Sequence, residues 1–125
     1  MTTLTPGKAD LTTLRRIARE KHAFDLDPAP RNGVDASRQV VEDILGHDAP
    51  VYGINTGFGQ LAHERIPKDK LTELQRNLVL SHATGTGAML GDKTVRLILT
   101  LKILGLARGF SGIRWAVIER LKKFL

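Results

Sequence analysis

Two side chains that can carry a proton stand beside glycine-rich stretches of this sequence. Tyr52 lies within VYGINTGFG, residues 51–59, and His82 lies within SHATGTG, residues 81–87. A phenol and an imidazole can each act as a general acid or base, or bind a polar group of a ligand through a hydrogen bond. Tyr52 and His82 are therefore the candidates for chemistry, and each also has a purely structural interpretation.

The stretch around Tyr52 combines three glycines with apolar side chains. Glycine permits positive φ angles and close approach of other groups, and it weakens a helix or strand. Residues 51–59 are therefore expected to form a loop whose apolar residues pack on the protein and direct Tyr52 to a chosen position. In the alternative interpretation, Tyr52 and Phe58 only anchor a long loop to the core.

His82 falls on the apolar stripe of a predicted helix, eleven residues after Leu71 and four after Leu78. This spacing places it at the end of the helix, beside a glycine loop. It is either a buried histidine satisfied by a backbone carbonyl or a residue for binding or acid–base chemistry, and spacing does not choose between them. Because no two of the four histidines have metal-ligand spacing, no metal site is expected.

The glycine runs do not match nucleotide-binding motifs. In GTGAMLGDKT, residues 85–94, Asp92 stands between the last glycine and the lysine, whereas a phosphate loop needs the two adjacent. The dinucleotide fingerprint also fails, because Leu90 occupies the position of its third glycine. Neither a phosphate loop nor a dinucleotide site is expected.

Hydrophobic periodicity predicts a mainly α fold with five helices and one structured glycine-rich loop. The helices are expected over about 12–21, from a cap at Asp35 to Gly46, from Pro67 or Asp69 into SHATGTG, from a cap at Asp92 to RGFSG, and from a cap at Ser111 onward. The fourth is apolar on most sides, as expected in the middle of a bundle or interface. The fifth still presents its apolar stripe at Leu125, which is typical of a chain that stops before its fold does.

Length and composition favour a single cytoplasmic domain. The 125 residues suffice for one core, and the absence of cysteine excludes disulfides and fits a reducing compartment. No basic segment followed by an apolar run begins the chain, so no secretory signal is expected. The most apolar stretch, VRLILTLKILGLA, is too short to span a bilayer and contains Arg96 and Lys102, so no membrane partner is expected.

The net charge of +6 raises the possibility of a nucleic-acid partner. Much of the basic excess is spread along predicted helices, as on a solvated face, and no aromatic residues alternate with it as single-strand binders require. No nucleic-acid partner is expected. The alternative, a basic nucleic-acid-binding protein, predicts binding with a steep salt dependence.

The order YGINTGFG, LQRNLVLSHATGTG, LARGFSGIR resembles the N-terminal part of the aromatic amino acid ammonia-lyases over nearly the whole chain. The SHATGTG form is most similar to the histidine ammonia-lyases. The resemblance implies a helical N-terminal segment of the ammonia-lyase fold, elimination of ammonia from L-histidine to give urocanate, and a homotetramer with active sites shared between subunits. It also implies acid–base catalysis by Tyr52 and binding of the substrate side chain by His82.

The family uses an electrophilic methylidene-imidazolone ring formed from an Ala-Ser-Gly tripeptide, and this chain contains no such tripeptide. The nearest look-alike is Phe110-Ser111-Gly112. Residues 1–125 are therefore expected to be an N-terminal segment that is inactive alone. Two alternatives stay open: a lyase or aminomutase for another aromatic amino acid, and a helical module that associates through its apolar fourth helix.

Overall fold

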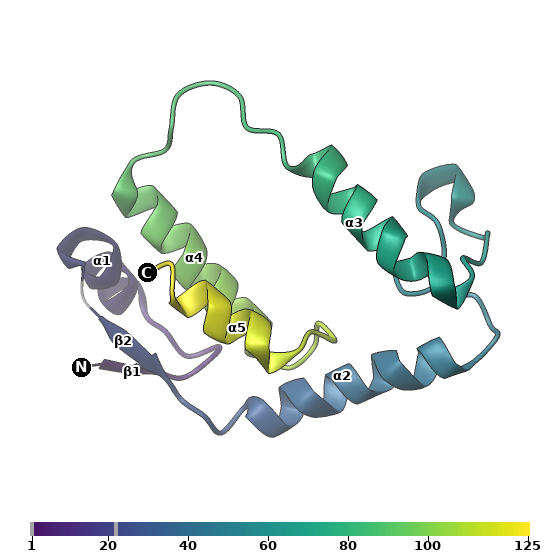
Figure 1. Ribbon diagram of the computed structural model, residues 1–125. Helices are drawn as coiled ribbons and strands as arrows, with labels where there is room; N and C mark the ends of the chain where they lie inside the picture. Colours follow the sequence, from purple (N-terminus) through teal and green to yellow (C-terminus); the bar gives the residue numbers. More distant parts are fainter. Residues whose placement is uncertain (1, 22) are drawn as a thin grey trace. The chain divides into compact units, whose positions relative to one another are not determined.

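The computed structural model describes residues 2–21 and 23–125 (Figure 1). The chain divides into two compact units. One unit combines the segment up to Gln39 with Met89–Leu125, and the other is Val40–Ala88. Most of the chain is helical, which confirms the predicted fold class.

The first unit combines a small sheet with helical segments. Its elements are β1 (Thr2–Leu4), α1 (Leu11–Glu20), β2 (Phe24–Leu26), the first part of α2 (Arg31–Gly46), α4 (Asp92–Leu106) and α5 (Trp115–Lys122). β1 and β2 pair in parallel, with Thr2 opposite Phe24 and Leu4 opposite Leu26. The sequence did not predict these strands, because three residues are too few to establish a period of two.

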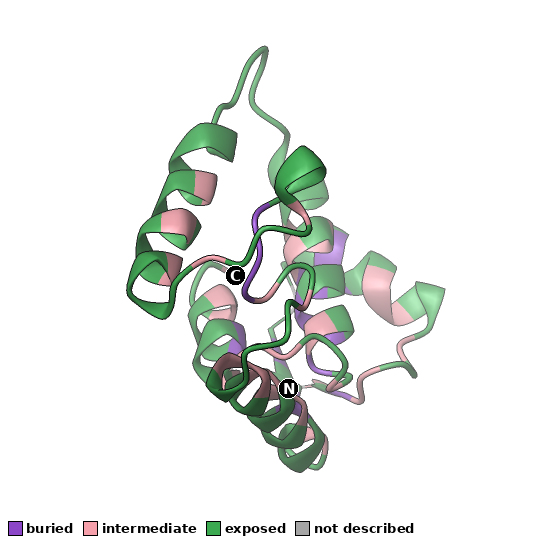
Figure 2. Ribbon diagram, turned by 90° about the vertical axis from the view of Figure 1, so that its right-hand side faces the viewer, coloured by how far each residue is buried: buried purple, intermediate pink, exposed green. Residues whose placement is uncertain are grey.

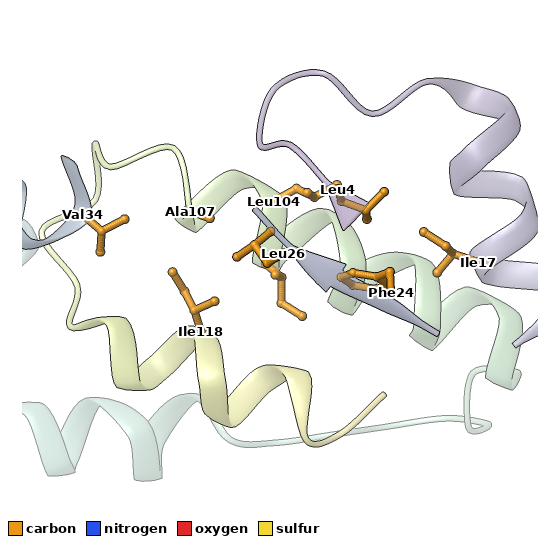
Figure 3. Close-up of a cluster of buried hydrophobic side chains, with 9 residues drawn as sticks. Leu4, Ile17, Phe24, Leu26, Val34, Leu104, Ala107 and Ile118 are labelled. Atoms are coloured by element: carbon orange, nitrogen blue, oxygen red, sulfur yellow. The ribbon is translucent and has the colours of Figure 1, made fainter. Parts of the chain in front are cut away.

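The core of the first unit lies between α4, its neighbours α1 and α5, and the sheet. Figure 2 shows the buried positions as short purple patches on a mostly exposed ribbon. Figure 3 draws the cluster, which consists of Leu4, Ile17, Phe24, Leu26, Val34, Ile103, Leu104, Ala107 and Ile118. α4 is buried on one side only: Ile103 is fully buried, whereas Ile98 is 51% exposed. Within the described residues this exposed side does not fit the middle of a bundle, and the expected alternative, an interface, stays a prediction.

The predicted caps Asp35 and Ser111 lie several residues away from the observed helix starts. α2 begins at Arg31, so Asp35 lies inside the helix, where its carboxylate pairs with Arg31 at 3.7 Å. The prolines before Arg31 explain the earlier start, because proline has a fixed φ that suits the first turn. α5 begins at Trp115, well after Ser111. The amide of Gly112 is held instead by the Oγ atom of Ser37, at 3.0 Å.

Asp92 is the first residue of α4 and not its cap, which is Gly91. The carboxylate of Asp92 makes no capping hydrogen bond and lies 3.7 Å from the ammonium group of Lys21. Its negative charge in the first turn is still favourable to the helix dipole.

The second unit contains the rest of α2, the 3₁₀ turns η1 (Gly59–Leu61) and η2 (Lys68–Lys70), and α3 (Leu71–His82). The start of α3 after a turn that follows Pro67 matches the prediction. α3 has no buried residue. Among the described residues, no helix combines the length and apolar character needed to cross a bilayer.

Candidate active site

The loop that carries Tyr52 is organised by the buried side chain of Asn55, which is 3% exposed. Its Oδ1 atom accepts a hydrogen bond from the amide of Val51 at 2.7 Å, and its Nδ2 atom donates to the carbonyl oxygen of Ala49 at 3.0 Å. The amide of Asn55 also donates to the carbonyl oxygen of Val51. The side chain thus closes the turn that contains Tyr52 and leaves its own polar atoms satisfied.

The far side of the loop folds back on the same turn. The amide of Ile66 donates to the carbonyl oxygen of Asn55 at 2.9 Å, and the amide of Gly57 donates to that of Glu64 at 3.0 Å. A Cβ atom on Gly57 would lie 2.6 Å from the Cβ atom of Leu61, so this position requires glycine. The prediction of a structured glycine-rich loop is confirmed.

Tyr52 projects from this loop with 63% of its surface exposed. Its ring lies edge-on to that of Phe58, with centroids 5.8 Å apart and an interplanar angle of 69°. Such an arrangement is favourable for aromatic pairs and orients the tyrosine ring. Because most of the ring remains in solvent, burial as a core anchor does not account for Tyr52. Its hydroxyl is accessible to a ligand.

His82 is the last residue of α3 and is exposed. The interpretation of His82 as a buried histidine is therefore wrong. The expected carbonyl partner is present: the Nδ1 atom of His82 lies 2.9 Å from the carbonyl oxygen of Leu78. Nδ1 also lies 3.0 Å from the Oγ atom of Ser81. The imidazole is therefore oriented by its own helix end while one side stays open to solvent.

Tyr52 and His82 lie in the same compact unit, but their side chains have different partners. In residues 2–21 and 23–125, no hydrogen bond, ion pair or ring contact joins them. Over the same residues, no group of three or more histidine, aspartate and glutamate side chains is placed to hold a metal ion. Both candidates are exposed, so a site that uses them needs further groups to exclude water and to stabilise charge.

Sequence reasoning missed two residues that shape these positions, Asn55 and Ser81. An asparagine among glycines is a signal for a side chain that closes a turn. A serine beside a histidine in the last helical turn is a weaker signal, because serine often bonds to its own helix backbone.

The family model for aromatic amino acid lyases matches residues 9–125 of the chain. The chain belongs to this family. A histidine ammonia-lyase from Burkholderia mallei is 52% identical over 121 residues, which are 97% of this chain and 24% of that protein. This lyase-family chain thus spans about a quarter of the length of the relatives it matches.

Solved structures agree with the family assignment. Tyrosine aminomutase from Streptomyces globisporus is 30% identical, with a TM-score of 0.88 over 98% of this chain and 23% of its own. Histidine ammonia-lyase from Trypanosoma cruzi is 32% identical, with a TM-score of 0.79 over 98% of this chain and 24% of its own. The mainly helical arrangement is therefore the lyase-family fold over the matched segment.

The residues of this lyase-family chain do not fit the formation of a methylidene-imidazolone ring, because the chain contains no Ala-Ser-Gly tripeptide. In the look-alike, Phe110 stands at the alanine position and is 81% exposed. The amide of Gly112 is bonded to Ser37, and its carbonyl oxygen lies 3.4 Å from a guanidinium nitrogen of Arg38. Phe110-Ser111-Gly112 is thus a structural turn before α5.

Proposed function

We propose that residues 1–125 form the N-terminal segment of an ammonia-lyase that converts L-histidine to urocanate and ammonia. The observation that carries the proposal is the 52% identity, over 97% of this chain, to a protein named histidine ammonia-lyase. The SHATGTG sequence, which begins in the last turn of α3, supports histidine as the substrate through its resemblance to that branch of the family. The expected location is the cytoplasm. Neither a membrane nor a nucleic acid is expected as a partner.

Tyr52 is proposed to act as the acid–base group. Elimination removes a proton from the β carbon of histidine and breaks the bond between the α carbon and the amine, leaving a carbon–carbon double bond and free ammonia. An exposed phenol held edge-on by Phe58 is suited to meet the β carbon, because its hydroxyl is accessible and its ring is oriented. Neighbouring positive charge must stabilise the phenolate, because an ordinary phenol has a pKa of about 10.

His82 is proposed to bind the substrate side chain. Its ring is held at the end of α3 by the carbonyl oxygen of Leu78 and leaves one nitrogen open. An imidazole in this position can form a hydrogen bond with the imidazole of L-histidine. The proposed division of labour is therefore that His82 positions the substrate and Tyr52 moves its proton.

The electrophile that makes the amine a better leaving group is proposed to come from a part of the protein beyond these residues, since the tripeptide is absent. Assembly as a homotetramer follows from the family resemblance. Val79 on α3 is an exposed apolar side chain, and so, in the other unit, is Ile98 on α4. Each supports a surface of its own unit that other parts of the assembly cover. The isolated chain is accordingly proposed to be inactive.

The test joins this chain to the part of the Burkholderia mallei relative that lies outside the matched segment. Urocanate and ammonia are measured with L-histidine, and the isolated chain is assayed beside the chimaera. We expect turnover by the chimaera and none by the chain. A folded tetrameric chimaera that releases no urocanate would overturn the proposed function, whereas turnover by the isolated chain would overturn the proposal of an incomplete site.

A second candidate is aminomutase or lyase chemistry on tyrosine or phenylalanine. The similarity to tyrosine aminomutase favours it, although at 30% identity this is weaker support than the histidine ammonia-lyase relationship. The same chimaera assayed with L-tyrosine and L-phenylalanine separates the candidates, because a β-amino acid or an aryl acrylate would replace urocanate as the main product.

A further inference from the structure

Three polar atoms meet at the C-terminal end of α3. The Nδ1 atom of His82 lies 2.9 Å from the carbonyl oxygen of Leu78 and 3.0 Å from the Oγ atom of Ser81. The Oγ atom of Ser81 lies 3.1 Å from the same carbonyl oxygen. All three separations are hydrogen-bond distances, so the positions of the protons decide which contacts attract.

The carbonyl oxygen of Leu78 fixes those positions, because a carbonyl oxygen can only accept. At 2.9 Å it faces Nδ1 of His82 favourably only if Nδ1 carries the hydrogen. The hydroxyl of Ser81 can donate to the same carbonyl oxygen and turn a lone pair toward Nδ1. In the opposite arrangement, with Nδ1 bare, the lone pairs of Nδ1 and the carbonyl oxygen would face each other.

We propose that Ser81 is a positioning residue that, with the Leu78 carbonyl, holds neutral His82 in the tautomer protonated at Nδ1. The Nε2 atom is then a hydrogen-bond acceptor. No protein partner occupies Nε2 in the part of the chain that the structure describes. The next step rests on the proposed function: Nε2 accepts a hydrogen bond from the N–H group of the substrate imidazole. Ser81 then affects substrate binding only through His82.

This tautomer is not the one that a free side chain prefers, because neutral histidine in water is mainly protonated at Nε2. The helix end must therefore impose it. The hydroxyl of Ser81 contributes by donating its own hydrogen to the Leu78 carbonyl oxygen and offering the Nδ1 hydrogen a second acceptor. An alanine at this position would retain the Leu78 carbonyl and lose the second acceptor.

The test is nitrogen NMR of the uniformly ¹⁵N-labelled chain at alkaline pH, where the neutral imidazole tautomers are observed. Long-range correlations from the ring carbon protons identify which nitrogen carries the hydrogen. The signals of His82 are assigned by their loss in His82→Gln. We expect the form protonated at Nδ1 to predominate for His82, and predominance of the Nε2-protonated form would overturn the proposal.

Ser81→Ala is expected to shift the tautomer ratio of His82 about threefold or more toward the Nε2-protonated form, as loss of one net hydrogen bond would. Ser81→Thr restores the hydroxyl and should restore the ratio. An unchanged ratio in Ser81→Ala would overturn the role of Ser81. Circular dichroism of each variant establishes that α3 is retained. If the alanine variant loses helix, Ser81→Cys replaces it, because a thiol is only a weak hydrogen-bond donor and acceptor.

The NMR measurement uses no substrate, so its outcome is independent of the proposed function. In the chimaera, Ser81→Ala should raise KM for L-histidine about threefold, the factor expected for one hydrogen bond, and leave kcat nearly unchanged. If Ser81→Ala instead lowered kcat about threefold and left KM constant, the proposal that Ser81 positions His82 for substrate binding would be contradicted. If the NMR shows the expected tautomer but the chimaera releases no urocanate, the proposed function is contradicted and the proposal about the tautomer is not.

Discussion

The turn after α4 lies directly against the first turn of α2, so that a Cβ atom on Gly109 would come within 2.8 Å of the carbonyl carbon of Gly33. Gly109 also has a φ of +81°, which side chains rarely adopt. The Gly112 amide, bonded to Ser37, fastens the same two segments. RGFSG is therefore a turn that packs against α2. Its first glycine, Gly109, is required both by its positive φ and by the lack of room for a Cβ atom beside Gly33.

Gly109→Ala should destabilise the chain by about 1–3 kcal/mol, because it adds left-handed strain and a backbone collision that α2 must relieve by moving. Urea unfolding followed by circular dichroism measures the change. Gly105→Ala is the matched control, since a Cβ atom there meets nothing within 4 Å and alanine favours a helix. A Gly109→Ala variant as stable as the control variant would contradict this packing against α2.

The helices could be predicted because their apolar residues recur with the helical period. Their first residues were harder to predict from the sequence. Asp35 and Ser111 both have the right residue type for a cap. Asp35 is instead paired with Arg31 inside α2, and the amide of Gly112 is taken by Ser37 from a distant segment. The hydrogen bond between Ser37 and the amide of Gly112 cannot be predicted from the local sequence, because it arises from tertiary packing.

Position in the core should decide the effect of deleting one methyl group from α4. Ile103 is fully buried, whereas Ile98 on the same helix is 51% exposed. Ile103→Val should cost about 1 kcal/mol of unfolding free energy, through lost apolar burial and a small cavity. Ile98→Val, measured by the same urea titration, should cost clearly less. Equal losses would indicate that Ile98 is covered when the chain is in solution.

Asp10 caps α1 and links its stability to pH. Its Oδ1 atom accepts a hydrogen bond from the amide of Thr13 at 2.6 Å, and this bond holds the pKa of the Asp10 carboxyl below its usual 3.8. The ionised form is therefore favoured by folding. Its contribution is complete above pH 3.8 and is lost as the pH falls through the lowered pKa.

Asp10→Ala should consequently lower the melting temperature at neutral pH, with a difference from the parent chain that shrinks in acid. Thermal unfolding at several pH values between neutral and acid measures this. Asp10→Asn is the control, because asparagine caps a helix without a charge and should give a cap contribution that does not change with pH. A difference between Asp10→Ala and the parent that stays constant on acidification would contradict the proposed linkage.

Of the candidate site, the sequence located Tyr52 and His82 through the motifs around them, while their roles stay predictions. It did not indicate that both side chains are exposed, because helical spacing describes a face and not what covers it. Asn55 was missed for a different reason. Its importance comes from two hydrogen bonds that close the loop, and only the folded backbone reveals them.

Asn55→Ala should loosen the loop that carries Tyr52. It leaves the amide of Val51 and the carbonyl oxygen of Ala49 without their partner. Because both hydrogen bonds are only partly buried, the cost should be about 1 kcal/mol. Amide hydrogen exchange over residues 49–57 should become faster, while exchange in α1 stays unchanged. Asn77→Ala on the exposed surface of α3 is the control. Unchanged exchange in Asn55→Ala would mean that the backbone alone holds the loop.

Tyr52→Phe and His82→Gln separate the two proposed roles in the chimaera that converts L-histidine. Removing the phenol hydroxyl should lower kcat about a hundredfold or more, the usual contribution of a general acid–base group, with little change in KM. His82→Gln should mainly raise KM, because it alters a contact to the substrate side chain. His63→Gln controls for the loss of an exposed imidazole and should leave both constants near their starting values. If Tyr52→Phe retained full kcat, the proton would have to be moved by another group, and the orientation of Tyr52 by Phe58 would serve the loop alone.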